Sequence, residues 1–197
     1  MSYVAARTEG AQGAPLLFTF HGTGGTEAQF HQLGQDLVRG AHVVSPRGDV
    51  SENGALRYFR RTAEGVYDMD DLAHRTAAMA DFIAAEKKAV GAPSVIGLGY
   101  SNGANILANV ALNRPDLVDD LILLHPLIPF DPKPQPGLDG RRILVTAGKR
   151  DPICPAEMTR SFVDYLQRQG AYLSEHWHDG GHELQQTELD AIARFIS

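Results

Sequence analysis

The chain has 197 residues, enough for one well-buried core and short for two ordinary domains, so we predict a single domain over residues 1–197. Hydrophobic residues make up 43%, charged residues 21% and the net charge is −6, which predicts a soluble protein without a membrane span or a basic surface for nucleic acid. The first 15 residues lack the pattern of a secretion signal and a single cysteine excludes an internal disulfide, so we expect a cytoplasmic protein.

The first predicted unit is a strand followed by a helix. After a short edge strand near residues 3–7, the apolar run 16–20 (LLFTF) predicts a buried strand that ends in the glycine-rich loop 21–25 (HGTGG). Thr26 and Gln29 have the spacing of a capping box at the start of the helix. Three apolar residues at helical spacing give this helix one buried face: Phe30, Leu33 and Leu37.

A second strand is predicted at residues 41–45, closed by Pro46. The stretch 47–67 then shows turn residues and no clear periodicity, so we predict that it is irregular. Long loops in compact domains tend to be functional, which makes this stretch a candidate wall or lid over a site.

A long helix is predicted over residues 69–90. Asp68, Asp70 and Asp71 crowd its start, where carboxylates interact favourably with the positive end of the helix dipole. Its expected core face consists of Met69, Leu72, Thr76, Met79, Ala80 and Ile83.

The stretch 99–103 (GYSNG) lies between a predicted buried strand at 94–98 and a predicted helix at 104–113. Its glycines, two residues on either side of Ser101, allow a tight turn without a Cβ clash. This pattern is typical of a nucleophile elbow, which exposes a serine hydroxyl at the end of a buried strand.

Strands and helices also alternate in the last third of the chain. A strand at 121–124 ends at His125, and the five prolines of residues 125–140 predict a stiff connection too short for a cap domain. Strands at 143–147 and 171–178 flank a helix that begins near Pro155, with Met158, Phe162, Tyr165 and Leu166 as its core face. A final helix is expected to bury Leu189, Ile192, Ala193 and Ile196.

This alternation predicts an α/β fold with a mostly parallel sheet of six or seven strands, helices on both faces and no separate cap domain. In such sheets ligands bind at the carboxyl ends of the strands. Several polar residues of this sequence follow predicted strands and are expected at that edge: His21, Ser101, His125, Asp151 and His182.

A serine nucleophile needs a base, and the base needs a third group that fixes its tautomer. Ser101, Asp151 and His182 follow one another in the order nucleophile, acid, base, each after a different predicted strand. We therefore predict these three as the catalytic residues, with Asp131 and Asp179 as rival acids.

Acyl transfer also passes through an oxyanion that backbone N–H groups must stabilise. Asn102 follows the nucleophile at the start of a helix and can supply one N–H, and Thr23 in the loop 21–25 can supply a second. His21 in the same loop is interpreted as bracing it, with proton transfer or substrate contact as the alternatives.

Four motifs in this order, HGTGG at 21–25, GYSNG at 99–103, RDPI at 150–153 and GHE at 181–183, resemble the small carboxylesterase and phospholipase group of α/β-hydrolases, which includes acyl-protein thioesterases. The resemblance covers nearly the whole chain. It implies Ser101, Asp151 and His182 as the triad, Thr23 and Asn102 as oxyanion-hole donors, a carboxylic ester or thioester as substrate, and no metal or organic cofactor.

Two departures from the thioesterase pattern bear on the substrate. Asn102 stands where thioesterases of this group usually have glutamine, and the stretch 45–61 resembles a subgroup of poorly characterised bacterial hydrolases. In that stretch Arg57, Arg60 and Arg61 form the tightest cationic cluster, and Arg60 or Arg61 could hold a substrate carboxylate. The alternative is a solvated basic turn.

Other residues have ordinary alternatives. Tyr100 and His125 follow or end strands and are candidates for lining the pocket, with plain packing as the alternative. Cys154 is interpreted as a small buried hydrophobe. His176 and His178 share a strand face but have no third ligand at a suitable spacing, so no metal site is predicted.

The sequence therefore predicts a serine hydrolase that cleaves a carboxylic ester of a small or medium acyl group. The alternative from a different class is a non-catalytic member of the fold that binds a small ligand in the same pocket, and a peptidase is the alternative within enzymes. The substrate, the choice between ester and thioester, and the oligomeric state, a homodimer included, stay open.

Overall fold

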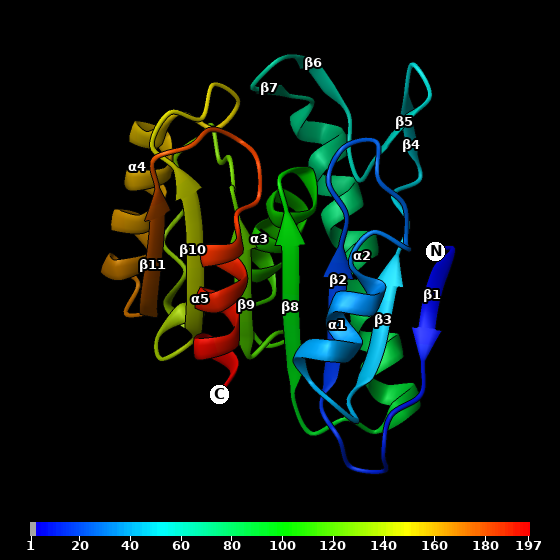
Figure 1. The fold of residues 1–197 in the computed structure, drawn as a ribbon. Coiled ribbons are helices and arrows are strands. Elements are labelled where there is room, and N and C mark those ends of the chain that lie inside the picture. The colour runs from blue at the N-terminus through cyan, green and yellow to red at the C-terminus, as the bar shows by residue number, and fades with distance from the viewer. Residues whose placement is uncertain (1–2) are drawn as a thin grey trace.

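The computed structural model describes residues 3–197. A seven-stranded sheet in the order β1-β3-β2-β8-β9-β10-β11 forms its centre (Figure 1). β1 at the edge is antiparallel to β3, and all other neighbouring strands of this sheet are parallel, as predicted. The strands of this sheet are β1 (Ala5–Thr8), β2 (Leu16–Phe20), β3 (His42–Pro46), β8 (Val95–Tyr100), β9 (Asp120–Leu124), β10 (Arg142–Gly148) and β11 (Tyr172–His178).

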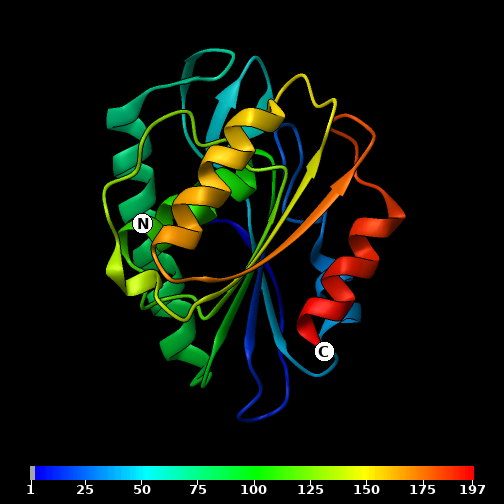
Figure 2. The same ribbon diagram turned by 90° about the vertical axis from the view of Figure 1, so that its left-hand side faces the viewer.

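Helices cover both faces of the sheet, which confirms the predicted α/β architecture. Figure 2, which views the sheet nearly edge-on, shows a layer of helices on either side of it. The first layer consists of α1 (His31–Leu37) and α5 (Gln186–Ile196). The second consists of α2 (Met69–Val90), α3 (Asn102–Asn113) and α4 (Ala156–Arg168).

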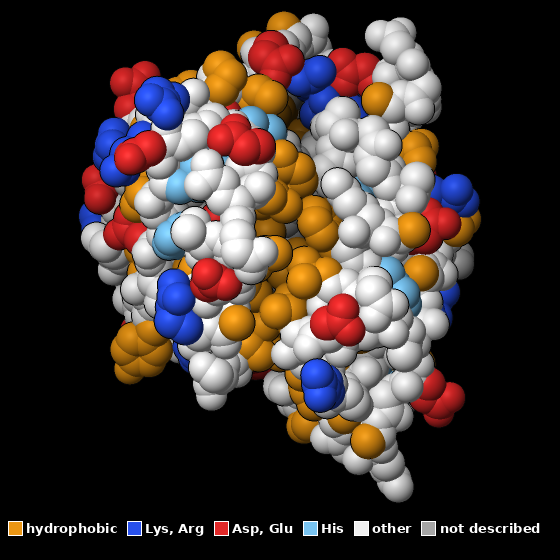
Figure 3. Space-filling view, viewed as in Figure 1, with side chains coloured by type: hydrophobic (Ala, Val, Ile, Leu, Met, Phe, Trp, Pro, Cys, Tyr) orange, Lys and Arg blue, Asp and Glu red, His pale blue; other side chains and the backbone are white. Residues whose placement is uncertain are grey.

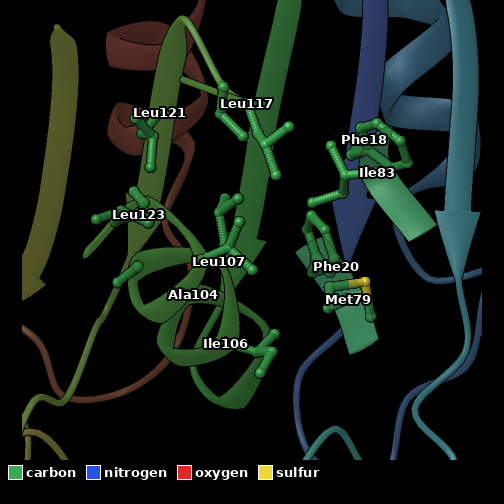
Figure 4. Packing of buried hydrophobic residues seen from close by; sticks show 14 of the residues in the cluster. Phe18, Phe20, Met79, Ile83, Ala104, Ile106, Leu107, Leu117, Leu121 and Leu123 are labelled. Atoms are coloured by element: carbon green, nitrogen blue, oxygen red, sulfur yellow. The ribbon is translucent and has the colours of Figure 1, made fainter. Parts of the chain in front are cut away.

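The larger hydrophobic core lies between the sheet and the layer of α2, α3 and α4. Phe18 and Phe20 of β2 lie beside Met79 and Ile83 of α2, with Leu107 of α3 close by (Figure 4). These side chains are all fully buried. Because helices cover both faces of the sheet, β2 has no face exposed to solvent, which explains its continuous apolar sequence.

A smaller core lies under α1 and α5 on the other face, around Leu98 and Ile122 of the central strands and Ile192 of α5. The two helices stand apart, and a band of hydrophobic side chains is visible between them in Figure 3.

The stretch 47–67 is more ordered than predicted. It forms two hairpins, one of β4 (Val50–Glu52) and β5 (Ala55–Arg57), the other of β6 (Arg61–Ala63) and β7 (Val66–Tyr67). Asn53 and Gly54 both have positive φ, 51° and 89°, as a two-residue Asn-Gly hairpin turn requires. The strands are only two or three residues long, too short for the alternation of side chains to stand out in the sequence.

The ends of the long helix follow its sequence signals. α2 begins where the Asp68 side chain accepts a hydrogen bond from the Asp71 N–H (3.0 Å) and ends at Gly91, which has a φ of 64°. The predicted range is confirmed. Met69, however, was wrongly assigned to the core face, because the first turn projects beyond the sheet and leaves this side chain 49% exposed.

Two other helices also differ from prediction. α1 begins only at His31, and the Gln29 side chain accepts from the Gly22 N–H (2.9 Å), so the predicted capping box does not form. In α5, Ala193 is exposed, whereas Ala191 and Phe195 join the core. Both errors come from tertiary contacts: the loop 21–25 recruits Gln29, and the rotation of α5 is set by the sheet.

The connection between β9 and β10 contains one short 3-10 helix, Pro136–Leu138, and within residues 3–197 no cap domain is inserted there. Within the same range, no helix has both the length and the hydrophobicity of a membrane span.

Candidate active site

Ser101 stands on a strained turn at the end of β8. Its φ and ψ are 53° and −118°, a conformation that L-residues rarely adopt. A Cβ on Gly103 would lie 2.5 Å from the carbonyl oxygens of Phe20 and His21, and a Cβ on Gly99 would lie 2.5 Å from the Gly103 carbonyl oxygen. Only glycine fits at either position, so the two glycines allow α3 to start directly against β2 and β8.

Ser101, His182 and Asp151 form a hydrogen-bonded chain, which we call the candidate triad. His182 Nε2 lies 2.9 Å from Ser101 Oγ, and His182 Nδ1 lies 2.7 Å from Asp151 Oδ2. Because Asp151 accepts the proton of Nδ1, Nε2 is left as the acceptor for the serine hydroxyl. This is the arrangement in which an imidazole can take a proton from serine.

The Asp151 carboxylate is fully occupied by donors. Its Oδ1 accepts from the N–H groups of Ile153 (2.8 Å) and Cys154 (2.9 Å), and its Oδ2 accepts from His182 and also from His125 (2.9 Å). Burial alone would raise the pKa of Asp151, but the hydrogen bonds from the two histidines outweigh it and hold this pKa well below its ordinary value. The carboxylate is therefore anionic at neutral pH. The two rival acids lie elsewhere: Asp179 pairs with Lys149, and Asp131 is exposed on the proline-rich connection.

The N–H groups of Thr23 and Asn102 donate no hydrogen bond to residues 3–197 and flank the pocket that Ser101 lines. Asn102 is the first residue of α3, so its N–H also lies at the positive end of the helix dipole. The Asn102 side chain instead accepts from the Tyr58 N–H (2.8 Å), which ties the elbow to the segment after β5.

His21 supports the loop 21–25 from inside. It is 2% exposed, its Nδ1 lies 2.7 Å from the Gly22 carbonyl oxygen, and its Nε2 accepts from the Gly48 N–H (2.9 Å). Burial lowers the pKa of His21, so the ring is neutral. Both ring nitrogens are used by the backbone, and His21 does not line the pocket.

A pocket of about 260 Å³ opens over Ser101. Its walls come from the loop 21–25, the two hairpins, the start of α3 and the loops after β9, β10 and β11. Six of its lining residues are predicted site residues, namely Thr23, Arg61, Tyr100, Ser101, Asn102 and His182.

Besides His21, two residues that were candidates for substrate contact, Arg60 and His125, do not line the pocket. Arg60 turns outward, 61% exposed, and pairs with Asp68 (3.2 Å) and Asp71 (3.6 Å). His125 is fully buried behind His182, where it bonds to Asp151 and Glu188. Arg60 and Arg61 are adjacent in sequence, but their side chains have different surroundings. Arg60 precedes β6 and pairs with acids at the start of α2, whereas Arg61 is the first residue of β6 and lines the pocket.

Arg57 and Arg61 line one wall of the pocket, together with Glu64. Both arginines pair with Glu52, at 2.8 Å and 3.1 Å, and Arg61 also pairs with Glu64 at 2.8 Å. Burial would raise the pKa of Glu52, but the two arginines outweigh it and lower this pKa. Glu52, which is not among the residues that line the pocket, thereby holds the two guanidinium groups in place.

A ring of hydrogen bonds that the sequence did not reveal braces the wall beside Ser101. Asn105 Nδ2 donates to Tyr67 Oη (2.8 Å), Tyr67 Oη donates to the Leu127 carbonyl (2.8 Å), and the Leu127 N–H donates to Asn105 Oδ1 (2.7 Å). The three residues come from α3, β7 and the loop after β9. The available signal was the recurrence of Asn in α3, at 102, 105, 109 and 113, in a helix whose other residues are apolar or glycine.

The structure also places four further side chains that the sequence analysis singled out. The Tyr100 hydroxyl donates to the His182 carbonyl (2.7 Å) and so braces the loop that carries the base. Cys154 is buried at the pocket floor, where burial raises the pKa of its thiol. His176 and His178 do not converge, because His176 contacts Thr187 (3.0 Å) and His178 contacts Glu188 (3.3 Å).

Known proteins that are similar to this chain include hydrolases and carboxylesterases. The chain is 41% identical to the Bacillus subtilis (strain 168) protein named "Putative hydrolase MhqD" over 177 residues, 89% of this chain and 88% of that protein. A Bacillus cereus carboxylesterase structure has a TM-score of 0.93 and 31% identity and covers 98% of this chain and 93% of its own. The structure of YahD with malic acid has a TM-score of 0.89 and 25% identity, with 99% and 98% covered. No family model matches the chain.

Proposed function

Since the chain belongs to the small carboxylesterase family of α/β-hydrolases, we propose that it cleaves carboxylic esters through an acyl-enzyme on Ser101. The observation that carries this proposal is the chain of hydrogen bonds from Ser101 through His182 to Asp151, which opens onto a pocket with two unpaired backbone N–H groups. Hydrolase and carboxylesterase relatives support ester hydrolysis in general.

In the proposed reaction, Ser101 Oγ attacks the ester carbonyl carbon while His182 Nε2 takes the hydroxyl proton. The N–H groups of Thr23 and Asn102 stabilise the oxyanion, and Asp151 stabilises the imidazolium. The ester bond then breaks, and His182 returns the proton to the leaving alkoxide. Water attacks the acyl-enzyme with His182 again as base, which releases the acid and restores Ser101.

The size of the pocket supports a small or medium acyl group. Its volume of about 260 Å³ is near the lower limit of small-molecule sites, which span roughly 300–1,000 Å³. A thioester has the same acyl carbon and would use the same residues, so thioester cleavage is part of this proposal. A panel of p-nitrophenyl esters and acyl-thiols of graded chain length measures both preferences.

We also propose that the substrate carries an anionic group that Arg61 and Arg57 bind. Both line the pocket, and the structural relative YahD was determined with malic acid, a dicarboxylate. Arg61→Ala should lower kcat/KM for a p-nitrophenyl ester with a free carboxylate at least tenfold, since charge-assisted hydrogen bonds contribute about 1.5–3 kcal/mol. For p-nitrophenyl acetate the loss should stay within about threefold.

Arg60→Ala is the matched control, because it removes the adjacent charge outside the pocket and should affect both esters equally little. An equal loss on the anionic and the neutral ester in Arg61→Ala would contradict anion binding.

A fluorophosphonate probe tests the serine hydrolase assignment. We expect the wild-type protein to be labelled covalently and Ser101→Ala to show no labelling. Wild type that resists labelling would instead support the non-catalytic ligand-binding alternative, and undiminished labelling of Ser101→Ala would place the nucleophile elsewhere. We do not propose a peptidase, because the pocket of about 260 Å³ over Ser101 is small for an extended peptide.

A further inference from the structure

His125 occupies an unusual position behind the candidate triad. It follows β9 with a φ of 50°, and its side chain is fully buried between two carboxylates. Its Nδ1 lies 2.9 Å from Asp151 Oδ2 and its Nε2 lies 3.0 Å from Glu188 Oε1. Its ring centroid is 5.2 Å from that of His182. Strained backbone of this kind persists only where the surrounding structure holds it, and here both ring nitrogens contact buried carboxylates.

The donors around Glu188 fix its charge. Its Oε1 accepts from the Thr146 hydroxyl (2.6 Å), and its Oε2 accepts from the Gln185 N–H (2.7 Å). His178 Nδ1 accepts from the Gly180 N–H (3.0 Å), so the ring carries its proton on Nε2, which faces Glu188 Oε2 at 3.3 Å. Every neighbour of this carboxylate is a donor, and Glu188 is therefore anionic.

The same reasoning applies to Asp151, whose two oxygens face four donors. Neither carboxyl group has a free acceptor to which it could itself donate a proton. His125 must then donate from both nitrogens, and only the imidazolium can do so. The result is a buried row of alternating charges: Glu188 negative, His125 positive, Asp151 negative.

We propose that His125, held by Glu188, is a positioning residue of the active site that carries a positive charge at neutral pH, fixes Asp151 and opposes a second positive charge on His182. When His182 accepts the serine proton, it becomes the fourth charge of the row. The positive charge of His125 repels a second positive charge on the His182 ring, whose centroid is 5.2 Å away. This inference rests on the proposed function, since it assigns a role within that site.

Other titratable side chains lie against this row in the described part of the chain. His178 of β11 contacts Glu188, and its Nε2 also lies 3.5 Å from His125 Nε2; Tyr100 of β8 lies edge-on to His125 at 5.9 Å. The uncharged Thr146 hydroxyl of β10 contacts Glu188. The Cys154 thiol donates to the His125 carbonyl (3.2 Å). Burial opposes a charge on His125, but the hydrogen bonds to Asp151 and Glu188 outweigh it and raise its pKa to about 9.

The first test is the pH dependence of kcat/KM in His125→Asn. The amide nitrogen of Asn can replace Nδ1 as donor to Asp151, and Asn tolerates positive φ, so the variant mainly removes the charge. We expect the midpoint of the acid limb, which reports His182, to rise by about one pH unit or more. His74→Asn on the exposed side of α2 is the matched control and should leave the midpoint unchanged.

A lower kcat at every pH with an unchanged midpoint would reduce His125 to a structural residue and overturn the proposal. p-Nitrophenyl acetate is the substrate, so a failure of wild type to hydrolyse it would count against the proposed function and not against this inference.

The second test needs no turnover. In ¹⁵N-histidine-labelled wild type, the His125 resonances, assigned by their loss in His125→Asn, should keep imidazolium shifts from pH 5 to 7.5. Glu188→Gln should lower the His125 titration midpoint by at least about one unit, whereas Asp190→Asn, an exposed acid on the same helix, should not. A neutral His125 ring in wild type at pH 7, or a midpoint unaffected by Glu188→Gln, would overturn the proposal.

Discussion

Asp151 shows how a single side chain can serve several partners. One oxygen accepts from two backbone N–H groups of the β10–α4 loop, and the other accepts from His182 and His125. The backbone bonds fix the rotation of the carboxylate, so that Oδ2 is aimed at both imidazoles. In the sequence, Asp151 could be predicted as the acid because it follows a strand. Its hydrogen bond with a second histidine, His125, could not be predicted in this way.

The proposed role of Asp151 predicts a large kinetic effect with little change in fold. Asp151→Asn should lower kcat by roughly 10³- to 10⁴-fold, because the amide no longer stabilises the imidazolium or holds the required tautomer of His182. KM should change little.

Steady-state kinetics with p-nitrophenyl acetate measure this effect. Asp179→Asn, which changes an exposed acid on the neighbouring loop, is the control and should stay within about twofold of wild type. A comparable loss in Asp179→Asn would reassign the acid.

At the scale of elements, the segment between β5 and β6 connects the hairpins to the elbow. Tyr58 is 1% exposed, and its hydroxyl donates to the Pro46 carbonyl (2.8 Å) and accepts from the His21 N–H (3.1 Å). Its own N–H donates to the Asn102 side chain. One residue thus links the ends of β2 and β3 with the first residue of α3, and the pocket wall is anchored to the sheet.

This anchoring predicts a measurable loss of stability in Tyr58→Phe. Removal of the hydroxyl leaves a buried N–H and a buried carbonyl without partners, which should lower the free energy of unfolding by about 1–3 kcal/mol. Urea denaturation measures the loss. Tyr172→Phe removes a hydroxyl that is 71% exposed and should change stability by less than about 0.5 kcal/mol; equal losses in both variants would argue against the buried anchor.

At the scale of the whole molecule, five neighbouring parallel strands end at one edge, and their loops deliver Thr23, Ser101, His125, Asp151 and His182 to the same place. The same convergence brings three charged side chains together in the interior, those of Glu188, His125 and Asp151. Burial of charges is costly unless they are paired and hydrogen-bonded, so the stability of the fold must depend on their protonation.

The raised pKa of His125, about 9, against an ordinary value near 6.5, predicts this dependence. Between these two values the folded chain binds one more proton than the unfolded chain, so the free energy of unfolding falls as pH rises. The contribution is fully present below about pH 6.5 and is lost as pH passes through about 9, in total on the order of 3 kcal/mol.

Urea denaturation at several values from pH 6 to 9.5 checks this prediction. Wild type should lose stability over that range relative to His125→Asn, which lacks the titrating group. Parallel curves for the two proteins would show that His125 carries no extra proton in the folded state.

The sequence by itself determined the α/β class, the mostly parallel sheet and the order of the elements. These follow from local patterns: short apolar runs for strands covered on both faces, helical spacing after them, and glycines where the backbone must turn. The positions of Ser101, Asp151 and His182 after strands could be predicted for the same reason, because the ends of parallel strands share an edge.

Only the tertiary structure decided which side chains meet at that edge. The separation of Arg60 from Arg61, the use of Gln29 by the loop 21–25 and the partnership of His125 with Glu188 depend on contacts between remote segments. A local pattern carries no information on such contacts, since the hydrogen bonds that select them form only after the strands align. The charge of His125 is the clearest case, because it is set by two acids 26 and 63 residues away.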